Sequence, residues 1–306
     1  MLFRKCLMKN VIVLNKKEGE TPLFALEKFR RKNPKYLNTP MTYAGRLDPM
    51  ASGVLVILAG EEIKNKDKYL GLDKEYEFSI LFGFSTDTYD ILGKVVNSLA
   101  GDSSLGNKLF SDAGDPLCLC GQVDLGLQKA YCLASNQLSR CEKIFASLIR
   151  KNLKYFKGNI KQKYPIYSSK TVKGKPLFSY ARNGEDVEIP ERDIFIKNIT
   201  LKKVKKINNK SLLLNIEKRI QKVKGPARRG GGDFRQKEIL KIWKNKLTLR
   251  QAQGRHKPQT FYIADFKIYC GSGTYVRGIA NSLGEKVNIP AVAFSIKRTK
   301  VGKFSI

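Results

Sequence analysis

The sequence predicts an α+β fold, in which helices flank a mixed sheet. Segments in which apolar and polar residues alternate, as in half-buried strands, are interleaved with segments of helical spacing. These segments do not follow the regular strand–helix–strand repetition of a parallel sheet. The chain has 306 residues, of which 42% are hydrophobic, and this is enough to build a sizeable core.

Three elements are predicted near the N-terminus. Residues 11–14 are apolar and predict a short strand. Residues 22–31 have helical spacing, with Thr21 as a candidate N-cap and Pro22 at the first helical position. Residues 53–60 predict a buried strand, and their apolar run is too short to span a bilayer.

Further elements follow along the chain. Alternating hydrophobicity predicts four strands, at residues 76–84, 194–204, 211–216 and 261–270. Residues 275–287 predict a helix, because Ile279 and Leu283 lie one helical turn apart.

The composition is dominated by positive charge. The chain carries 58 Lys and Arg against 27 Asp and Glu, a formal charge of +31 at pH 7. Such a charge predicts a polyanionic partner, with nucleic acid as the first candidate and an anionic membrane surface as the second. The single His, His256, argues against His-based zinc sites and against Ser-His-Asp or Cys-His hydrolases. The sequence contains neither a P-loop nor a complete dinucleotide-binding fingerprint.

The N-terminus lacks the apolar core of a signal peptide, so we expect a soluble, cytoplasmic protein. Four of the six cysteines fall within residues 118–141. Their spacing matches no standard zinc knuckle, and free thiols are the ordinary state of cysteine in a reducing cytosol. We therefore expect no metal site.

Two segments interrupt the pattern and are predicted as insertions in a single domain spanning residues 1–306. Residues 98–140 are rich in Gly, Ser and Cys and carry almost no net charge. Residues 217–260 contain fourteen Lys or Arg against three Asp or Glu. Because this basic segment lies between two predicted strands, we interpret it as a long hairpin insertion. Two roles remain open for it: contact with RNA, or a disordered and dispensable loop.

The segment from Thr42 to Leu55 carries the strongest chemical signal. It reads Thr-Tyr-Ala-Gly-Arg-Leu-Asp-Pro-Met-Ala-Ser-Gly-Val-Leu. Taken alone, Asp48-Pro49 is typical of a turn or of a helix N-cap. The alternative is a reactive carboxylate placed between two glycines and held by the buried strand that follows.

This segment resembles the signature of the TruB family of tRNA pseudouridine synthases, Gly-x-Leu-Asp-Pro followed by Ala-Ser/Thr-Gly-Val-Leu. Further segments resemble the family in the same order, at residues 14–19, 74–93, 158–184, 270–284 and 296–302. The resemblance implies the pseudouridine synthase fold, an α+β fold with a mixed, mainly antiparallel sheet and flanking helices.

The resemblance also implies roles for the matched residues. Asp48 would be the catalytic carboxylate that detaches uracil from its ribose before the base rejoins through carbon. Attack on the sugar, attack on the base and proton abstraction all remain open for it. Arg182, in Tyr-Ala-Arg-x-Gly, would orient this carboxylate with its guanidinium. Tyr76 would stack on the flipped base, although a strand residue of this kind can equally belong to the core.

Other residues are implied to bind the substrate, namely Lys16, Tyr43, Tyr180, Ile296 and Arg298. Lys170 is implied to brace the site or to meet phosphate. Tyr43 stands where the family usually has His, and it keeps a flat ring on which a base can stack.

The resemblance thus predicts a tRNA pseudouridine synthase that isomerises the T-loop uridine at position 55. We expect a monomer that binds the T arm of tRNA and requires no membrane, metal or nucleotide cofactor. We expect no separate C-terminal RNA-binding domain, because the chain ends soon after Gly302. Two alternatives remain: a non-catalytic RNA-binding protein on the same scaffold, or the same chemistry on another RNA.

Overall fold

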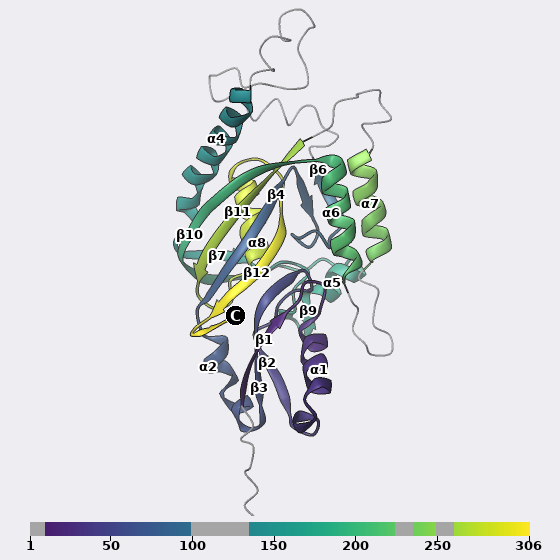
Figure 1. Ribbon diagram of the computed structural model, residues 1–306, viewed down its shortest axis with the longest axis vertical. Helices are drawn as coiled ribbons and strands as arrows, with labels where there is room; N and C mark the ends of the chain where they lie inside the picture. Colours follow the sequence, from purple (N-terminus) through teal and green to yellow (C-terminus); the bar gives the residue numbers. More distant parts are fainter. Residues whose placement is uncertain (1–9, 99–134, 224–234, 249–259) are drawn as a thin grey trace, which may run out of the picture.

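The computed structural model describes residues 10–98, 135–223, 235–248 and 260–306. Within these residues the fold is α+β, and its centre is a nine-stranded mixed sheet (Figure 1). The strand order is β1 (Val11–Lys16), β3 (Ala51–Ala59), β12 (Ala291–Val301), β4 (Lys74–Phe82), β11 (Thr260–Cys270), β10 (Glu191–Asn208) and β7 (Gly158–Lys163). The short strands β2 (Met41–Ala44) and β13 (Phe304–Ser305) pair with β3 and β12.

The sheet is mainly antiparallel, as expected. Among the described strands, β12 and β3 form the one parallel pair, and it is short, joining residues 296–298 to residues 51–53. Two hairpins lie apart from the sheet, β5 (Phe84–Thr86) with β6 (Val95–Ser98), and β8 (Thr171–Val172) with β9 (Lys175–Pro176).

The helices pack on both faces of the sheet. They are α1 (Pro22–Lys32), α2 (Lys66–Leu70), α4 (Ser135–Asn152), α5 (Leu177–Asn183), α6 (Asn209–Gln221), α7 (Gln236–Thr248) and α8 (Val276–Lys286). Short 3-10 turns occur at Pro34–Tyr36, Gly60–Asn65 and Leu153–Phe156. No helix in the described part of the chain is long and apolar enough to cross a membrane.

Alternation along the central strands divides the core between the two faces. On β4, Ile80 and Phe82 belong to the cluster that includes α4 and α8, while Leu81 belongs to the cluster formed with α6 and α7. Side chains on a strand point alternately to opposite faces, so each neighbouring residue joins a different cluster. Figure 1 shows α6 and α7 side by side, and α4 on the opposite side of the strands.

Most predicted elements are confirmed. The strands at 11–14, 53–60, 76–84, 194–204 and 261–270 and the helices at 22–31 and 275–287 are present, with end shifts of a few residues. Thr21 caps α1 by accepting a hydrogen bond from the Phe24 amide. Asp48-Pro49 forms a turn rather than a helix N-cap, with the Ala51 amide donating to the Asp48 carbonyl.

The prediction of a strand at residues 211–216 is wrong, because this segment belongs to helix α6. Asn208 caps the helix by accepting a hydrogen bond from the Ser211 amide. Leu212, Ile216 and Ile220 follow at intervals of four and are all fully buried. This buried face of the helix extends over more than six residues, so the alternation seen within residues 211–216 alone does not reveal it.

The basic segment does connect two paired strands, because β10 and β11 run antiparallel. Its described part contains helix α7 and the end of α6, and these pack against the sheet. The alternative of a disordered insertion is therefore wrong for residues 217–223 and 235–248. His256 and most of the segment rich in Gly, Ser and Cys, including Cys118, Cys120 and Cys132, lie outside the described residues.

Candidate active site

Asp48 lies in a loop between β2 and β3 that is fixed at both ends. Leu47 and Met50 on either side of it are buried in the core. Gly53 has φ +106°, and a Cβ at this position would lie 2.1 Å from the carbonyl oxygen of Arg298. Glycine therefore allows β3 to approach β12 closely just after the loop, and this ties the end of the Asp48 loop to β12.

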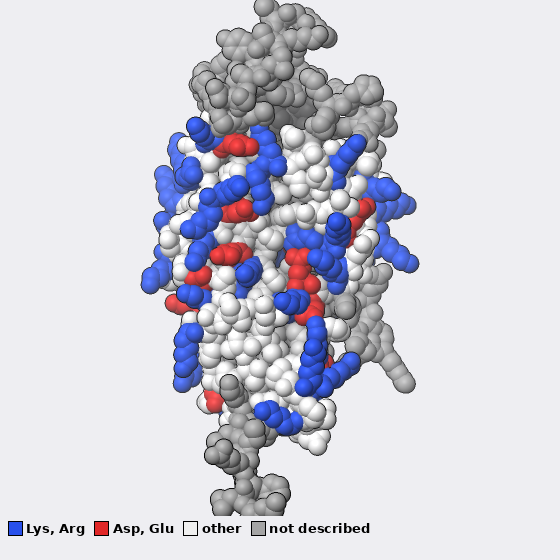
Figure 2. Space-filling model, viewed as in Figure 1, with Lys and Arg blue, Asp and Glu red and all other residues white. Residues whose placement is uncertain are grey.

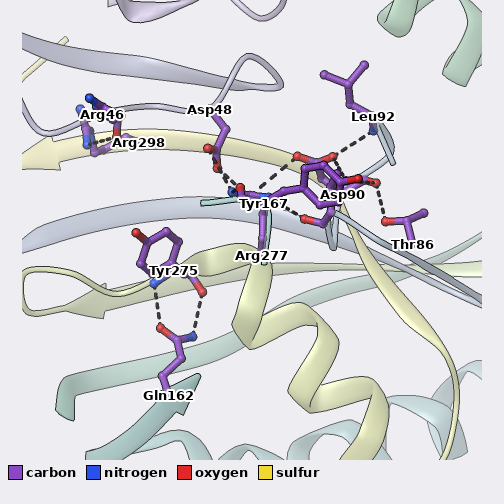
Figure 3. Close-up of polar contacts among 11 residues, drawn as sticks. Arg46, Asp48, Thr86, Asp90, Leu92, Gln162, Tyr167, Tyr275, Arg277 and Arg298 are labelled. Atoms are coloured by element: carbon purple, nitrogen blue, oxygen red, sulfur yellow. Dashed lines mark hydrogen bonds and ion pairs between the residues drawn. The ribbon is translucent and has the colours of Figure 1, made fainter. Parts of the chain in front are cut away.

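A buried guanidinium holds the Asp48 carboxylate from two sides. Arg277 Nε donates to Asp48 Oδ2 at 2.7 Å, and Arg277 Nη2 donates to Oδ1 at 3.2 Å (Figure 3). The Arg277 side chain is 5% exposed and that of Asp48 is 39% exposed. The bidentate pair fixes the plane of the carboxylate while leaving Asp48 open to a ligand.

A second carboxylate, that of Asp90, faces Arg277 from the other side (Figure 3). Asp90 Oδ2 lies 3.8 Å from Arg277 Nε, and Oδ1 accepts hydrogen bonds from the Thr88 hydroxyl and the Leu92 amide. Burial raises the pKa of the Asp90 carboxyl, and the nearby charge of Arg277 opposes this shift. Arg277 also donates to the backbone carbonyls of Thr88 and Tyr167.

The expectation that Arg182 orients Asp48 is wrong, because Arg277 takes this place. Arg182 is exposed near the end of α5, where its guanidinium lies over the Phe178 ring at 5.2 Å. Both arginines occur in segments that resemble the TruB family, Tyr-Ala-Arg-x-Gly for Arg182 and Gly-Thr-Tyr-Val-Arg for Arg277. The second segment therefore made Arg277 a candidate as well, but neither segment shows by itself which arginine contacts Asp48.

Gln162 on β7 sets the start of α8 and so the placement of Arg277. Its side-chain amide forms two hydrogen bonds with the backbone of Tyr275, each 2.9 Å long (Figure 3). Burial raises the pKa of the Tyr275 hydroxyl, and the charge of Asp48 raises it further. Tyr275 was not among the predicted site residues, yet it lies within electrostatic reach of Asp48.

Tyr76 lies on β4, directly opposite Arg298 on β12. Its ring is part of the main hydrophobic cluster. Burial raises the pKa of its hydroxyl, the guanidinium of Arg298 opposes the shift, and Asp48 adds a smaller increase. The Tyr76 side chain is thus largely buried, and its hydroxyl is electrostatically coupled to Asp48.

Two of the predicted substrate-binding residues are buried and brace the loops around Asp48. Lys16 Nζ donates to the backbone carbonyls of Glu20 at 2.6 Å and Pro49 at 3.5 Å. Burial lowers the pKa of Lys16 to about 8, against the opposing effect of Asp48. Arg298 donates to the Val54 carbonyl at 2.8 Å and to the carbonyls of residues 45 and 46.

The remaining predicted residues lie in different surroundings. The Tyr180 hydroxyl donates to the Val172 carbonyl at 2.9 Å, which ties α5 to the β8–β9 hairpin. Ile296 is buried on β12. Lys170 is exposed, with its ammonium over the Tyr164 ring.

A groove lies beside the loop that carries Asp48. It has a volume of about 580 Å³ and is lined by residues of α1, β2 and α2 together with Gly45 and Arg46. Tyr43 forms part of its wall, as do Arg30 and Lys66. The groove thus combines an aromatic ring with cationic groups, a combination that suits a nucleotide.

The family model described as TruB family pseudouridylate synthase (N terminal domain) matches residues 35–112 and 129–226, more than half of the chain. The chain is 26% identical to tRNA pseudouridine synthase B of Caldicellulosiruptor saccharolyticus over 98% of its own length and 69% of that protein. It is 29% identical to tRNA pseudouridine synthase B of Caldanaerobacter subterraneus subsp. tengcongensis over 86% of its own length.

The chain spans 60% of the length of that second relative, and about half of the length of the matching chains in three solved structures. A crystal structure of a Cbf5-Nop10-Gar1 complex contains a chain that matches with a TM-score of 0.45 and 16% identity. The match covers 96% of this chain and 49% of that chain.

Proposed function

The chain belongs to the TruB family of pseudouridylate synthases, and on this premise we propose that it is a tRNA pseudouridine synthase acting on the T-loop uridine at position 55. The observation that carries the proposal is the Asp48 carboxylate, held by two hydrogen bonds from Arg277. This carboxylate lies in the loop with the Gly-x-Leu-Asp-Pro sequence. The relatives named tRNA pseudouridine synthase B support the choice of tRNA as substrate.

The proposed reaction is an isomerisation in which Asp48 is the nucleophile. The N1–C1′ bond of the uridine breaks, the uracil turns, and a C5–C1′ bond forms. The bond that the Asp48 carboxylate makes to the nucleotide during this sequence is broken again before product leaves, so the carboxylate is regenerated. The proton leaves C5 and N1 carries one in the product, so no atom is gained or lost overall. Arg277 contributes by holding the carboxylate in one orientation, which reduces the entropy lost on reaching the reactive geometry.

The uridine must leave its stack before Asp48 can reach it, so the enzyme needs groups that hold an extruded base. We assign stacking on the base to Tyr76 and stacking within the opened loop to Tyr43 in the groove wall. Arg182 and Lys170 are exposed and suited to phosphate. Lys16 and Arg298 act indirectly, because their donors are already bonded to backbone carbonyls around the Asp48 loop.

The charge of the surface supports RNA as the partner. Lys and Arg side chains are spread over the face shown in Figure 2, and acidic side chains are fewer. Phosphate contacts made by such a surface position a folded RNA without reading its sequence. The proposal includes a monomeric, cytoplasmic enzyme that engages the T arm.

Release of tritium from C5-labelled uridine tests the chemistry directly. We expect the wild-type protein to release tritium from a labelled tRNA transcript and Asp48→Asn to release none, because the amide is a far weaker nucleophile. Both proteins should bind the transcript equally well. Equal release by the two proteins would refute the assignment of Asp48, and binding without release by either would favour a non-catalytic RNA-binding protein.

The choice of RNA needs a separate experiment. An isolated T-arm hairpin should be modified at rates close to those of the whole tRNA, while stem-loops of other sequence should react much more slowly. If ribosomal or messenger RNA stem-loops react at comparable rates, the proposed reaction stands but the assignment of tRNA as the substrate is wrong.

A further inference from the structure

The helical hairpin formed by α6 and α7 contacts the loops on both sides of the candidate site. It connects β10 to β11, and its buried residues pack on one face of the sheet (Figure 1). Its buried residues share one hydrophobic cluster with Met50, which closely follows Asp48, and with Ile91 and Leu92, which follow Asp90. This hairpin therefore packs against both segments that supply carboxylates to Arg277.

Helix α6 forms a bidentate ion pair with the turn between β1 and α1, which lies next to the Asp48 loop. Arg219, which is 8% exposed, donates to Glu18 Oε1 at 2.9 Å through Nε and to Oε2 at 2.8 Å through Nη2. The turn that contains Glu18 is bonded to the Asp48 loop, because the Gly19 amide donates to the Pro49 carbonyl at 2.8 Å. A continuous series of contacts thus links Arg219 to the loop that carries Asp48.

The same turn also packs directly against the end of α6. A Cβ on Gly19 would lie 2.3 Å from the Lys222 carbonyl oxygen. Such close backbone packing leaves little freedom for the turn to move without the helix. Displacement of α6 would therefore be transmitted to the Asp48 loop.

Helix α7 reaches the Asp90 loop through a buried tryptophan. Trp243 is fully buried, and its Nε1 donates to the Ile91 carbonyl at 3.2 Å. At the start of α7, Arg235 pairs with Asp87 at 3.2 Å, and its guanidinium lies over the Tyr167 ring. These contacts fix the loop on the side of Arg277 opposite to Asp48.

We propose that the α6–α7 hairpin sets the placement of Asp48 and Asp90 around Arg277, with Arg219 and Trp243 as its positioning residues. This inference rests on the proposed function, since it concerns the geometry of the same reaction. Asp48 and Asp90 lie on two loops, and among the described contacts no hydrogen bond joins one loop to the other. The α6–α7 hairpin contacts both loops and therefore controls the distance between the two carboxylates. The hairpin then affects the rate of the chemical step more than the affinity for RNA.

The test measures single-turnover tritium release at saturating enzyme, RNA binding, and thermal unfolding on the same proteins. Arg219→Gln removes the ion pair with Glu18, and Trp243→Phe removes the hydrogen bond to Ile91 while keeping an aromatic ring. We expect each to slow release by about tenfold with an unchanged RNA dissociation constant, because small displacements of reacting groups reduce rates strongly. Glu18→Gln combined with Arg219→Gln should be no slower than Arg219→Gln alone, since both remove one interaction.

Lys218→Gln is the matched control. Lys218 precedes Arg219 on α6 and is exposed, so the substitution also removes one positive charge from this helix but leaves the contacts with both loops in place. This variant should keep the wild-type rate. If Arg219→Gln fails to fold, Trp243→Phe decides the question alone.

If the contacts of the hairpin serve stability alone, their loss will lower the unfolding temperature of these variants and leave the single-turnover rate of the folded protein unchanged. Wild-type rates in the folded variants would therefore overturn the inference and leave the proposed function intact. Absence of release by the wild-type protein would instead overturn the proposed function, and the inference with it.

Discussion

Arg277 is the residue on which the geometry of the proposed nucleophile depends most directly. Its planar guanidinium bonds both oxygens of Asp48, whereas a lysine ammonium would supply a point charge without that fork. We expect Arg277→Lys to lower the single-turnover rate by about 100-fold, with little change in RNA affinity. Rapid-quench measurement of tritium release, together with filter binding, checks both parts.

Arg182→Lys is the natural comparison, because sequence resemblance alone gave Arg182 this role. Its guanidinium is exposed over Phe178. We expect the substitution to leave the single-turnover rate close to that of the wild type, and any effect to fall on RNA affinity. A rate loss as large as that of Arg277→Lys would contradict the assignment drawn from the structure.

The buried carboxyl of Asp90 predicts a dependence of the reaction on acid pH. Burial raises its pKa, so on acidification Asp90 takes up a proton at a higher pH than an exposed Asp does. Protonation removes one of the two negative charges that hold Arg277. We therefore expect the single-turnover rate to fall on the acid side before ordinary aspartates titrate. Asp90→Asn should abolish this fall in rate on the acid side of the pH–rate profile. If the fall is unchanged in the variant, protonation of Asp90 is not its cause.

The sequence identified the candidate nucleophile and missed its partner for a physical reason. Asp48 lies in a continuous signature, which can be read from neighbouring residues alone. Arg277 is 229 positions away, and the fold brings it to Asp48 through the placement of α8. Two arginines in matched segments were available, and local sequence contains no information on which one approaches the carboxylate.

Among the elements, five strands of the sheet and the helices α1 and α8 were predicted, whereas the helices α4, α6 and α7 and the strand β12 were not. The buried strand β3 and the capped helix α1 have signals within their own residues. Helix α6 was mistaken for a strand because its buried face is defined by packing on Leu81 and Phe261 of the sheet. The two-residue strands β8 and β9 are too short to carry any pattern.

Gly53 provides a test of how the sheet holds the Asp48 loop. An added Cβ would clash with the Arg298 carbonyl oxygen at 2.1 Å, and φ is +106°. We expect Gly53→Ala to lower the free energy of unfolding by about 3 kcal/mol, because both strain and displacement of β12 contribute. Urea denaturation measures this difference.

Gly60→Ala is the control at the other end of β3. Gly60 also has positive φ, at +59°, but nothing lies within 4 Å of an added Cβ. The expected cost is about 1 kcal/mol, from backbone strain alone. Equal losses in the two variants would show that the close approach of β3 to β12 contributes no stability.

For the whole molecule, the net charge of +31 predicts binding that depends strongly on salt. If about six phosphates of the T arm are neutralised, affinity should fall by about a thousandfold between 50 and 200 mM salt. The logarithm of the binding constant should decrease linearly with the logarithm of salt concentration. A flat plot would contradict recognition of RNA through its phosphates.

The central claim is that Asp48 isomerises one uridine of the T loop. The most direct test uses a tRNA transcript that carries tritium only at C5 of the uridine at position 55. Wild type and Asp48→Asn are compared at RNA concentrations that saturate both proteins. We expect the wild type to release nearly all the label and Asp48→Asn to release none. Release at equal rates by the two proteins, or none from this position by the wild type, would contradict it.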